Sequence, residues 1–126
     1  MPTLGDIMHS DVFNAEPGTS VAEVAKIMVK RRLGSVLVTR GDVLIGIFTE
    51  RDVLRADAAA ADLSTSPLSS WMTKDPETGT PDLDAEEAAQ IMLSRGFRHL
   101  PVCDGNRVAG IVSLRDVLAT RIGCPR

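Results

Sequence analysis

The sequence predicts an α/β (α+β) fold in which a strand–helix–strand–strand–helix (β-α-β-β-α) unit occurs twice, the two copies packing sheet to sheet with pseudo-twofold symmetry. Residues 4–54 align with residues 68–118 at a constant offset of 64 and without a gap, and 17 of the 51 aligned positions are identical. Average residue usage would give roughly three identities. A unit of about 50 residues cannot bury its sheet alone, so we expect the two copies to pack together.

The first helix of each copy is predicted from its cap and from the spacing of its apolar residues. Ser20 and Glu23 form a capping box, and Asp84 and Glu87 form its acidic counterpart in the second copy. Apolar residues follow at i, i+3, i+4, i+7 and i+8 in both copies, which is typical of a helix with one buried face. Lead-ins and extended segments are expected before these helices, over 4–8 and 12–15 in the first copy and over 68–72 and 76–80 in the second.

A β-hairpin and a second helix complete each copy. Gly34 and Gly96 are expected to end the first helices, and two aliphatic runs around a tight turn then predict the hairpin. The runs are 35–39 and 43–48 around Arg40-Gly41-Asp42, and 100–103 and 108–112 around Asp104-Gly105-Asn106.

The predicted domain organisation is a first repeat with its linker over residues 1–62, a second repeat over 63–120 and a tail over 121–126. The alanine-rich stretch 56–62 favours helix, so the second helix of the first copy should fray through it into the linker. Gly123 and Pro125 predict a loose tail.

Composition narrows the function. The net charge of -3 and the three Phe, one Trp and absence of Tyr argue against binding of duplex or single-stranded nucleic acid. No apolar run approaches the ~18 residues of a membrane span, and no signal pattern is present, so we expect a cytoplasmic protein. Cys103 and Cys124 provide neither a disulfide framework nor a metal site. His9, near a surface lead-in, is expected to be inert.

The most strongly repeated stretch is the junction between the hairpin and the second helix. It reads GIFTERDVL over residues 46–54 and GIVSLRDVL over residues 110–118. A hydroxyl residue followed by Asp three positions later is a capping box, and we expect it to cap the helix. Capping does not explain the Arg before the Asp in both copies, or the glycine three residues before the hydroxyl.

The junction also has the chemistry of a ribonucleotide site. A helix N-terminus with an adjacent Arg, Arg51 or Arg115, favours a phosphate. The carboxylate of Asp52 or Asp116 accepts hydrogen bonds and therefore suits the two hydroxyl groups of a ribose. Glycines and small apolar residues leave space for a flat base.

These motifs resemble those of a pair of CBS domains, named for cystathionine β-synthase and also called a Bateman module. The matching stretches are residues 6–8, 11–12, 46–54 and 110–118, with Arg98-His99-Leu100-Pro101-Val102 as a further match. The resemblance covers residues 4–120 and implies a regulatory module that binds AMP, ADP, ATP or S-adenosylmethionine in clefts between the repeats. It also implies homodimers that stack through their helices, and an unknown regulated protein as partner.

The resemblance implies a set of ligand-binding residues. In the family the hydroxyl and Asp of one junction act with an early-strand polar residue of the other repeat. Carried over, Thr49, Arg51 and Asp52 would act with Thr78, and Ser113, Arg115 and Asp116 with Asn14, which departs from the usual Thr. Backbone around Gly34, Ser35 and Val36, or around His99 and Leu100, would border the base, and Arg98 and His99 are either phosphate ligands or an exposed basic pair. Because the first repeat has Gly34-Ser35 at that place, one anion site should be tighter.

Two other functions compete with nucleotide sensing. A ligand-free dimerisation or interaction domain would use the junctions only as helix caps. An enzyme is disfavoured because the sequence lacks a nucleophile–base pairing, a P-loop and a dinucleotide-binding glycine pattern. We therefore expect no catalytic residues, no metal and no required cofactor.

Overall fold

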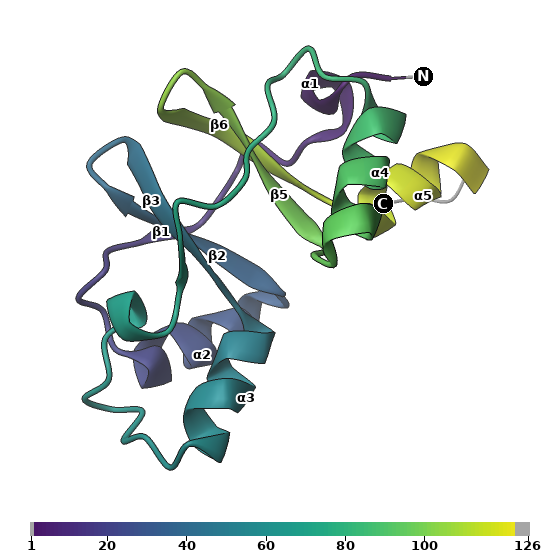
Figure 1. Cartoon of the computed structure of the whole chain (residues 1–126). Coiled ribbons are helices and arrows are strands. Elements are labelled where there is room, and N and C mark those ends of the chain that lie inside the picture. The colour runs from purple at the N-terminus through teal and green to yellow at the C-terminus, as the bar shows by residue number, and fades with distance from the viewer. Residues whose placement is uncertain (1, 123–126) are drawn as a thin grey trace. The chain divides into compact units, whose positions relative to one another are not determined.

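The computed structural model describes residues 2–122 of the chain, which form two compact units (Figure 1). The N/C unit consists of Met1–Val12 and Glu77–Arg126, and the central unit consists of Phe13–Pro76. None of the helices among residues 2–122 is long and apolar enough to cross a membrane.

The central unit has a four-stranded sheet with helices built on the predicted pattern. β2 (Ser35–Arg40) pairs with β1 (Asn14–Ala15) in parallel and with β3 (Val43–Thr49) antiparallel, and β3 pairs with β4 (Thr73–Lys74) antiparallel. Its helices are α2 (Val21–Arg31), α3 (Glu50–Ala58) and the 3₁₀ turn η1 (Leu68–Ser70). The core residues, all from these elements, are Ala15, Val21, Val24, Met28, Val36, Val38, Phe48 and Leu68.

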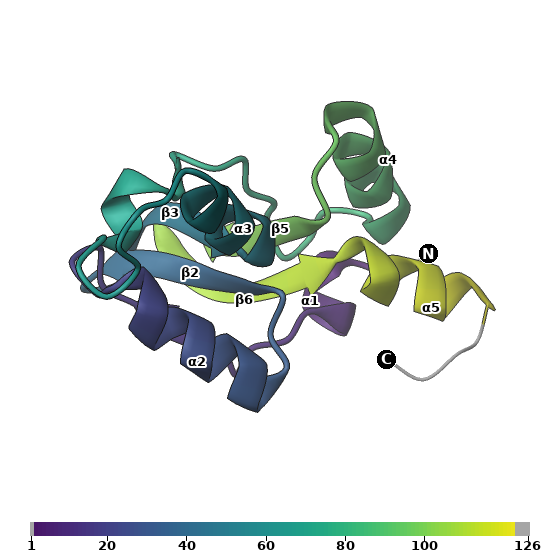
Figure 2. The same cartoon turned by 90° about the horizontal axis from the view of Figure 1, so that it is seen from below.

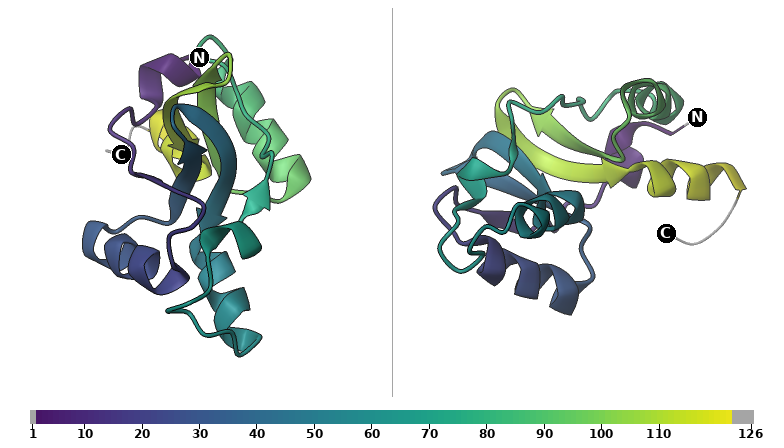
Figure 3. Two further views of the ribbon diagram at one scale, coloured as in Figure 1. Left: turned by 90° about the vertical axis from the view of Figure 1, so that its left-hand side faces the viewer. Right: turned by 60° about the horizontal axis from the view of Figure 1, so that its bottom comes forward.

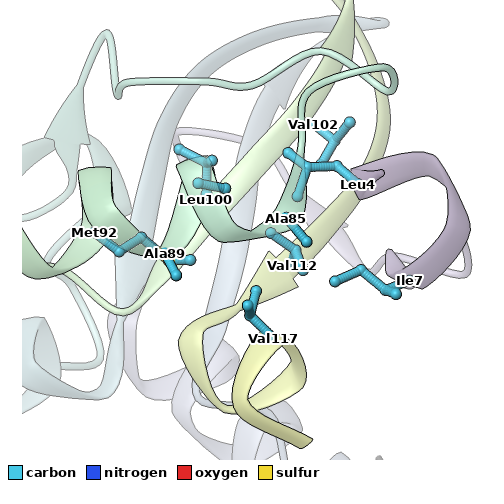
Figure 4. Packing of buried hydrophobic residues seen from close by; sticks show 10 residues of the cluster. Leu4, Ile7, Ala85, Ala89, Met92, Leu100, Val102, Val112 and Val117 are labelled. Carbon is cyan, nitrogen blue, oxygen red and sulfur yellow. The ribbon is translucent and has the colours of Figure 1, made fainter. Parts of the chain in front are cut away.

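The N/C unit repeats this arrangement with α1 (Leu4–Ile7), α4 (Ala85–Arg95), β5 (His99–Asp104), β6 (Arg107–Ser113) and α5 (Leu114–Ile122). β5 and β6 form the antiparallel hairpin. The bridges His9↔Ile111 and Gly79↔Val102 stand where β4 and β1 pair in the central unit, at the same offset of 64. The core of the unit draws on α1, α4, both strands and α5, as Figure 4 shows for Leu4, Met92, Leu100, Val112 and Val117 among others. The predicted strand–helix–strand–strand–helix order is confirmed, with the first strand reduced to the bridge at Gly79 in the N/C unit.

The two repeats of the sequence exchange their lead-ins, so that each lead-in packs against the other repeat. The first lead-in (residues 2–12) starts the chain but packs in the N/C unit, where α1 lies beside β6 (Figure 2) and Leu4 is in the core. The second lead-in (residues 63–76, teal in Figure 3) packs in the central unit, where Leu68 is in the core. Backbone bonds fix both segments: Leu4 N–H donates to Leu83 O at 2.8 Å, and Leu68 N–H donates to Thr19 O at 2.9 Å. Each repeat of the sequence therefore completes the core of the other.

The expected end of the first helix in the central unit and the expected start of the tail differ from the structure. Gly96 ends α4 as predicted, with φ 77°, but α2 ends at Arg32, with φ 57°, and not at Gly34. The repeat explains this, because position 32 is equivalent to position 96, and the backbone takes the same left-handed turn there although the residue is Arg. The expected tail also starts late: Arg121 and Ile122 belong to α5, and residues 123–126, with Cys124, lie outside the described residues.

Candidate functional site

The junction aspartates cap their helices as predicted. In the N/C unit, Ser113 N–H donates to Asp116 Oδ2 at 3.0 Å, and Asp116 N–H donates back to Ser113 Oγ at 3.0 Å. In the central unit, Asp52 Oδ2 accepts from the N–H of Thr49 at 2.9 Å and from its hydroxyl at 3.3 Å. Asp52 and Asp116 are only 5% and 7% exposed, so two carboxylates are buried at equivalent places.

A second side chain contacts each carboxylate, and it differs between the units. Asp52 Oδ1 accepts from Arg55 Nη1 at 2.8 Å, and the guanidinium of Arg55 lies 5.7 Å from the centre of the Trp71 ring. At Asp116 the partner is His9, whose Nε2 is 3.3 Å from both carboxylate oxygens. His9 therefore contacts the junction, a contact that the sequence did not predict.

The surroundings of Asp116 favour its charged form. Burial raises the pKa of this carboxyl, but hydrogen bonds from the backbone and side chain of Ser113 and the contact with His9 outweigh it. The net result is a pKa below the ordinary value of 3.8. The carboxylate is thus an ionised acceptor at neutral pH, as a site for ribose hydroxyl groups requires.

The junction glycines are explained by the lead-ins. A Cβ at Gly110 would lie 2.7 Å from His9 O and 2.8 Å from Met8 Sδ. A Cβ at Gly46 would lie 2.5 Å from Met72 Sδ. The close approach that the sequence suggested for a ligand is therefore made by the protein's own chain.

The first N–H groups of the two helices are already bonded. Glu50 N–H donates to Gly34 O at 3.1 Å, and Leu114 N–H donates to Arg98 O at 2.9 Å. Gly34 and Arg98 thus act through their carbonyl groups as caps of α3 and α5. An anion near either junction would gain from the helix dipole and the exposed Arg side chain more than from a row of free N–H groups.

A groove of about 800 Å³ runs between α2 and α3 of the central unit. It takes in Gly34 and Arg51 of the predicted site but not Thr49 or Asp52. The lining residues are Ala25, Met28, Val29, Arg32, Leu33, Gly34, Glu50, Arg51, Val53 and Leu54. The groove is therefore a feature of the helical face, separate from the carboxylate.

The other predicted residues fall into two groups. Within a unit, strand pairing places Ser35 opposite Thr49, and His99 opposite Ser113. The side chains of Val36 and Leu100 lie in the two cores, so only their backbones remain to border a base. Asn14 belongs to the central unit and Thr78 to the N/C unit, whereas the junctions assigned to them belong to the other unit. Their participation stays a prediction.

Sequence reasoning missed His9, Arg55 and Trp71 because it searched for repeated residues. The equivalents of these three at the offset of 64 are Thr73, Ala119 and Ile7. A signal was present for Arg55, since an Asp and an Arg three residues apart on a helix pair readily. Nothing in the sequence brings His9 to Asp116, which is 107 residues away.

Among residues 2–122, no cluster of His, Cys, Asp and Glu could hold a metal ion. The sequence matches the CBS domain family twice, over residues 4–59 and 68–123.

The chain belongs to the CBS domain family.

Similar proteins agree with this assignment. The CBS domain-containing protein YhcV of Bacillus subtilis is 32% identical over 97% of this chain and 87% of its own length. A CBS-domain-containing protein from Agrobacterium tumefaciens, 33% identical, superposes with a TM-score of 0.87 over 94% of this chain and 98% of that one. The CBS domain pair of protein MJ0100, solved with 5-methylthioadenosine and S-adenosyl-L-methionine, is 26% identical with a TM-score of 0.89, covering 98% of both chains. Stand-alone CBS pairs are thus its structural relatives.

Proposed function

We propose that this CBS pair is a regulatory module, and not an enzyme, that binds an adenosyl ligand at its two helix junctions. The observation that carries the proposal is the duplicated buried aspartate at a helix start, Asp52 and Asp116, each preceded by an exposed Arg. The MJ0100 pair, which was solved with two adenosyl compounds, supports the ligand class. AMP, ADP, ATP and S-adenosylmethionine all belong to it.

Each part of the ligand has a counterpart at a junction. The carboxylate, which only accepts hydrogen bonds, offers its oxygens to the ribose hydroxyl groups, above all Oδ1, which the Thr49 or Ser113 N–H leaves unbonded. Arg51 and Arg115 provide cations for a phosphate. Arg98 and His99 add basic groups in the N/C unit only, so we propose that its junction binds anions more tightly.

Thermal unfolding tests the proposal directly. A ligand at a hundredfold excess over its Kd adds about 2.7 kcal/mol to the stability of the folded chain. AMP, ATP or S-adenosylmethionine at millimolar concentration should therefore raise the Tm by several degrees. Asp52→Asn and Asp116→Asn should each reduce the shift, while Asp104→Asn, at an exposed strand end, serves as the control. The absence of a shift with every adenosyl compound would favour an interaction domain without a ligand.

We also propose that the protein is a cytoplasmic homodimer whose helical faces meet. Val29 and Leu54 are exposed on the groove of the central unit, and their equivalents Leu93 and Leu118 are exposed in the N/C unit. Four exposed apolar side chains at repeat-related places are typical of a surface that a partner covers. Light scattering of wild type and Leu54→Glu tests this, and a monomeric wild type would contradict it.

A further inference from the structure

Both junction aspartates are linked to the exchanged lead-in of their unit through a nitrogen-bearing side chain. In the N/C unit the contact is direct, since His9 belongs to the first lead-in and lies 3.3 Å from Asp116. In the central unit it passes through Arg55, which bonds Asp52 at 2.8 Å and stacks over Trp71 of the second lead-in. The sequence uses different residues at different positions to make the same connection.

The backbone beside these contacts holds each lead-in by few bonds. His9 and Ile111 exchange two hydrogen bonds, His9 N–H to Ile111 O at 2.9 Å and Ile111 N–H to His9 O at 3.0 Å. In the second lead-in, Asp75 N–H donates to Ile45 O at 3.2 Å next to the two-residue strand β4. Short edge pairings of this kind open locally at little cost in free energy. The side-chain contact therefore contributes to holding this end of each lead-in, while Leu4, Ile7 and Leu68 anchor the other end in the cores.

A ligand and the lead-in compete for the same carboxylate oxygens. Asp116 Oδ2 already accepts from Ser113, so a pair of hydroxyl groups would meet His9 at Oδ1. Asp52 Oδ2 already accepts twice from Thr49, so the hydroxyl groups would meet Arg55 at Oδ1. The side chains of His9 and Arg55 are 54% and 55% exposed, which lets either side chain turn into water when it is displaced.

We propose that each junction aspartate couples ligand occupancy to its lead-in, so that ribose hydroxyl groups on the carboxylate displace the side chain of His9 or Arg55 and loosen the strand pairing beside it. This inference rests on the proposed function for its ligand, but the contact between aspartate and lead-in does not. The first lead-in should respond more readily, because a contact of 3.3 Å with an imidazole is weaker than a 2.8 Å bond to a guanidinium that also stacks on Trp71. The output of ligand binding would then be the local opening of the His9–Ile111 pairing, with Leu4 and Ile7 still anchored in the core.

Amide hydrogen exchange of the full chain tests the contact without any ligand. Asp116→Asn keeps an oxygen for the Ser113 N–H but loses the charge. The amides of His9 and Ile111 should then exchange about three to ten times faster, as expected for weakening of one partly exposed hydrogen-bonded contact to a carboxylate. The amide of Asp75 is the internal control, and Asp52→Asn should give the reverse pattern. If Asp116→Asn does not fold, His9→Gln removes the same contact from the other side.

Two results would show that the aspartate contact does not hold the lead-in. One is unchanged amide exchange at His9 and Ile111 in both Asp116→Asn and His9→Gln. The other is an equal acceleration in both lead-ins, which would indicate global destabilisation.

Amide hydrogen exchange in the presence of AMP or S-adenosylmethionine tests the ligand step. Binding should raise the Tm while the His9 and Ile111 amides exchange faster. 2′-Deoxyadenosine monophosphate, which lacks one hydroxyl group, should accelerate this exchange less. A bound ligand that slows exchange at His9 would overturn the coupling. A chain that binds none of the three compounds would overturn both the proposed function and the ligand step, whereas the contact is judged by the variants alone.

Discussion

The junction of the central unit and the junction of the N/C unit have the same backbone and the same buried carboxylate, but different partners for it. Asp52 has a permanent cation, Arg55, from its own helix. Asp116 has His9, from a segment 107 residues away. The position of Arg55 is Ala119 in the N/C unit, so neither solution is copied. The comparison shows that a buried carboxylate needs a donor, and that the fold leaves open which element provides it.

The largest expected effect concerns the exchanged lead-ins. Leu4 and Leu68 occupy equivalent positions and are both fully buried, one in each unit. Leu4→Ala should destabilise the N/C unit by about 3 kcal/mol and Leu68→Ala the central unit by a similar amount, because each leaves a cavity. Chemical denaturation measures the loss, and amide exchange shows which unit opens. Opening of the sequence repeat that contains the mutation, instead of the unit, would contradict the exchange.

Alanine substitutions at the two junction glycines should destabilise the two units to different extents. A Cβ at Gly110 meets the backbone oxygen of His9 at 2.7 Å, whereas one at Gly46 meets the flexible Met72 side chain first and the backbone oxygen of Thr73 only at 3.0 Å. Gly110→Ala should therefore cost about 2 kcal/mol and Gly46→Ala less, since a methionine moves more easily than a strand. Urea unfolding of the two variants gives the difference. Equal losses would mean that the first lead-in yields as easily as a side chain.

The sequence predicted most of the fold because the signals for it are local and occur twice. The caps at Ser20 and Asp84, the hairpin turns and the two junctions all depend on residues within a few positions of one another. The exchange of lead-ins was not predicted, because residues 4–8 and 68–72 fit either core equally well by their apolar pattern. The apolar pattern of a repeat indicates which of its surfaces are buried, but it does not indicate which copy of the repeat covers them.

The candidate site was predicted only in part for a related reason. Asp52 and Asp116 were found because they recur, while Arg55 and His9 were missed because they do not. The meaning of Gly46 and Gly110 also changed: the sequence indicated a close approach, but the structure shows that the lead-in makes it. Residues that occur in both repeats can be recognised from the sequence, whereas partners that differ between the units can be recognised only from the structure.

The residues with left-handed backbone conformation at the ends of α2 and α4 give a smaller effect on stability, which for Arg32→Gly is a gain. Arg32 has φ 57°, where α4 has Gly96 with φ 77°. Arg32→Gly should stabilise the central unit by about 1 kcal/mol, because glycine takes this conformation without steric strain. Gly96→Ala should destabilise the N/C unit by about the same amount. Thermal unfolding checks both, and a loss of stability in Arg32→Gly would show that the Arg side chain makes a compensating contact at the groove.

The smallest effect is a dependence on pH that distinguishes the N/C junction. The pKa of Asp116 is lowered in the folded chain, so its ionised form contributes stability that is present above the unfolded pKa, about 4, and is lost as the pH falls through the folded value. Wild type should therefore lose more stability than Asp116→Asn below about pH 4. Asp6 and Asp62 also have lowered pKa values, but they titrate in both proteins and cancel in the difference. Unfolding free energies measured between pH 2.5 and 7 that stay parallel for the two proteins would show that Ser113 and His9 do not hold the carboxylate in its ionised form.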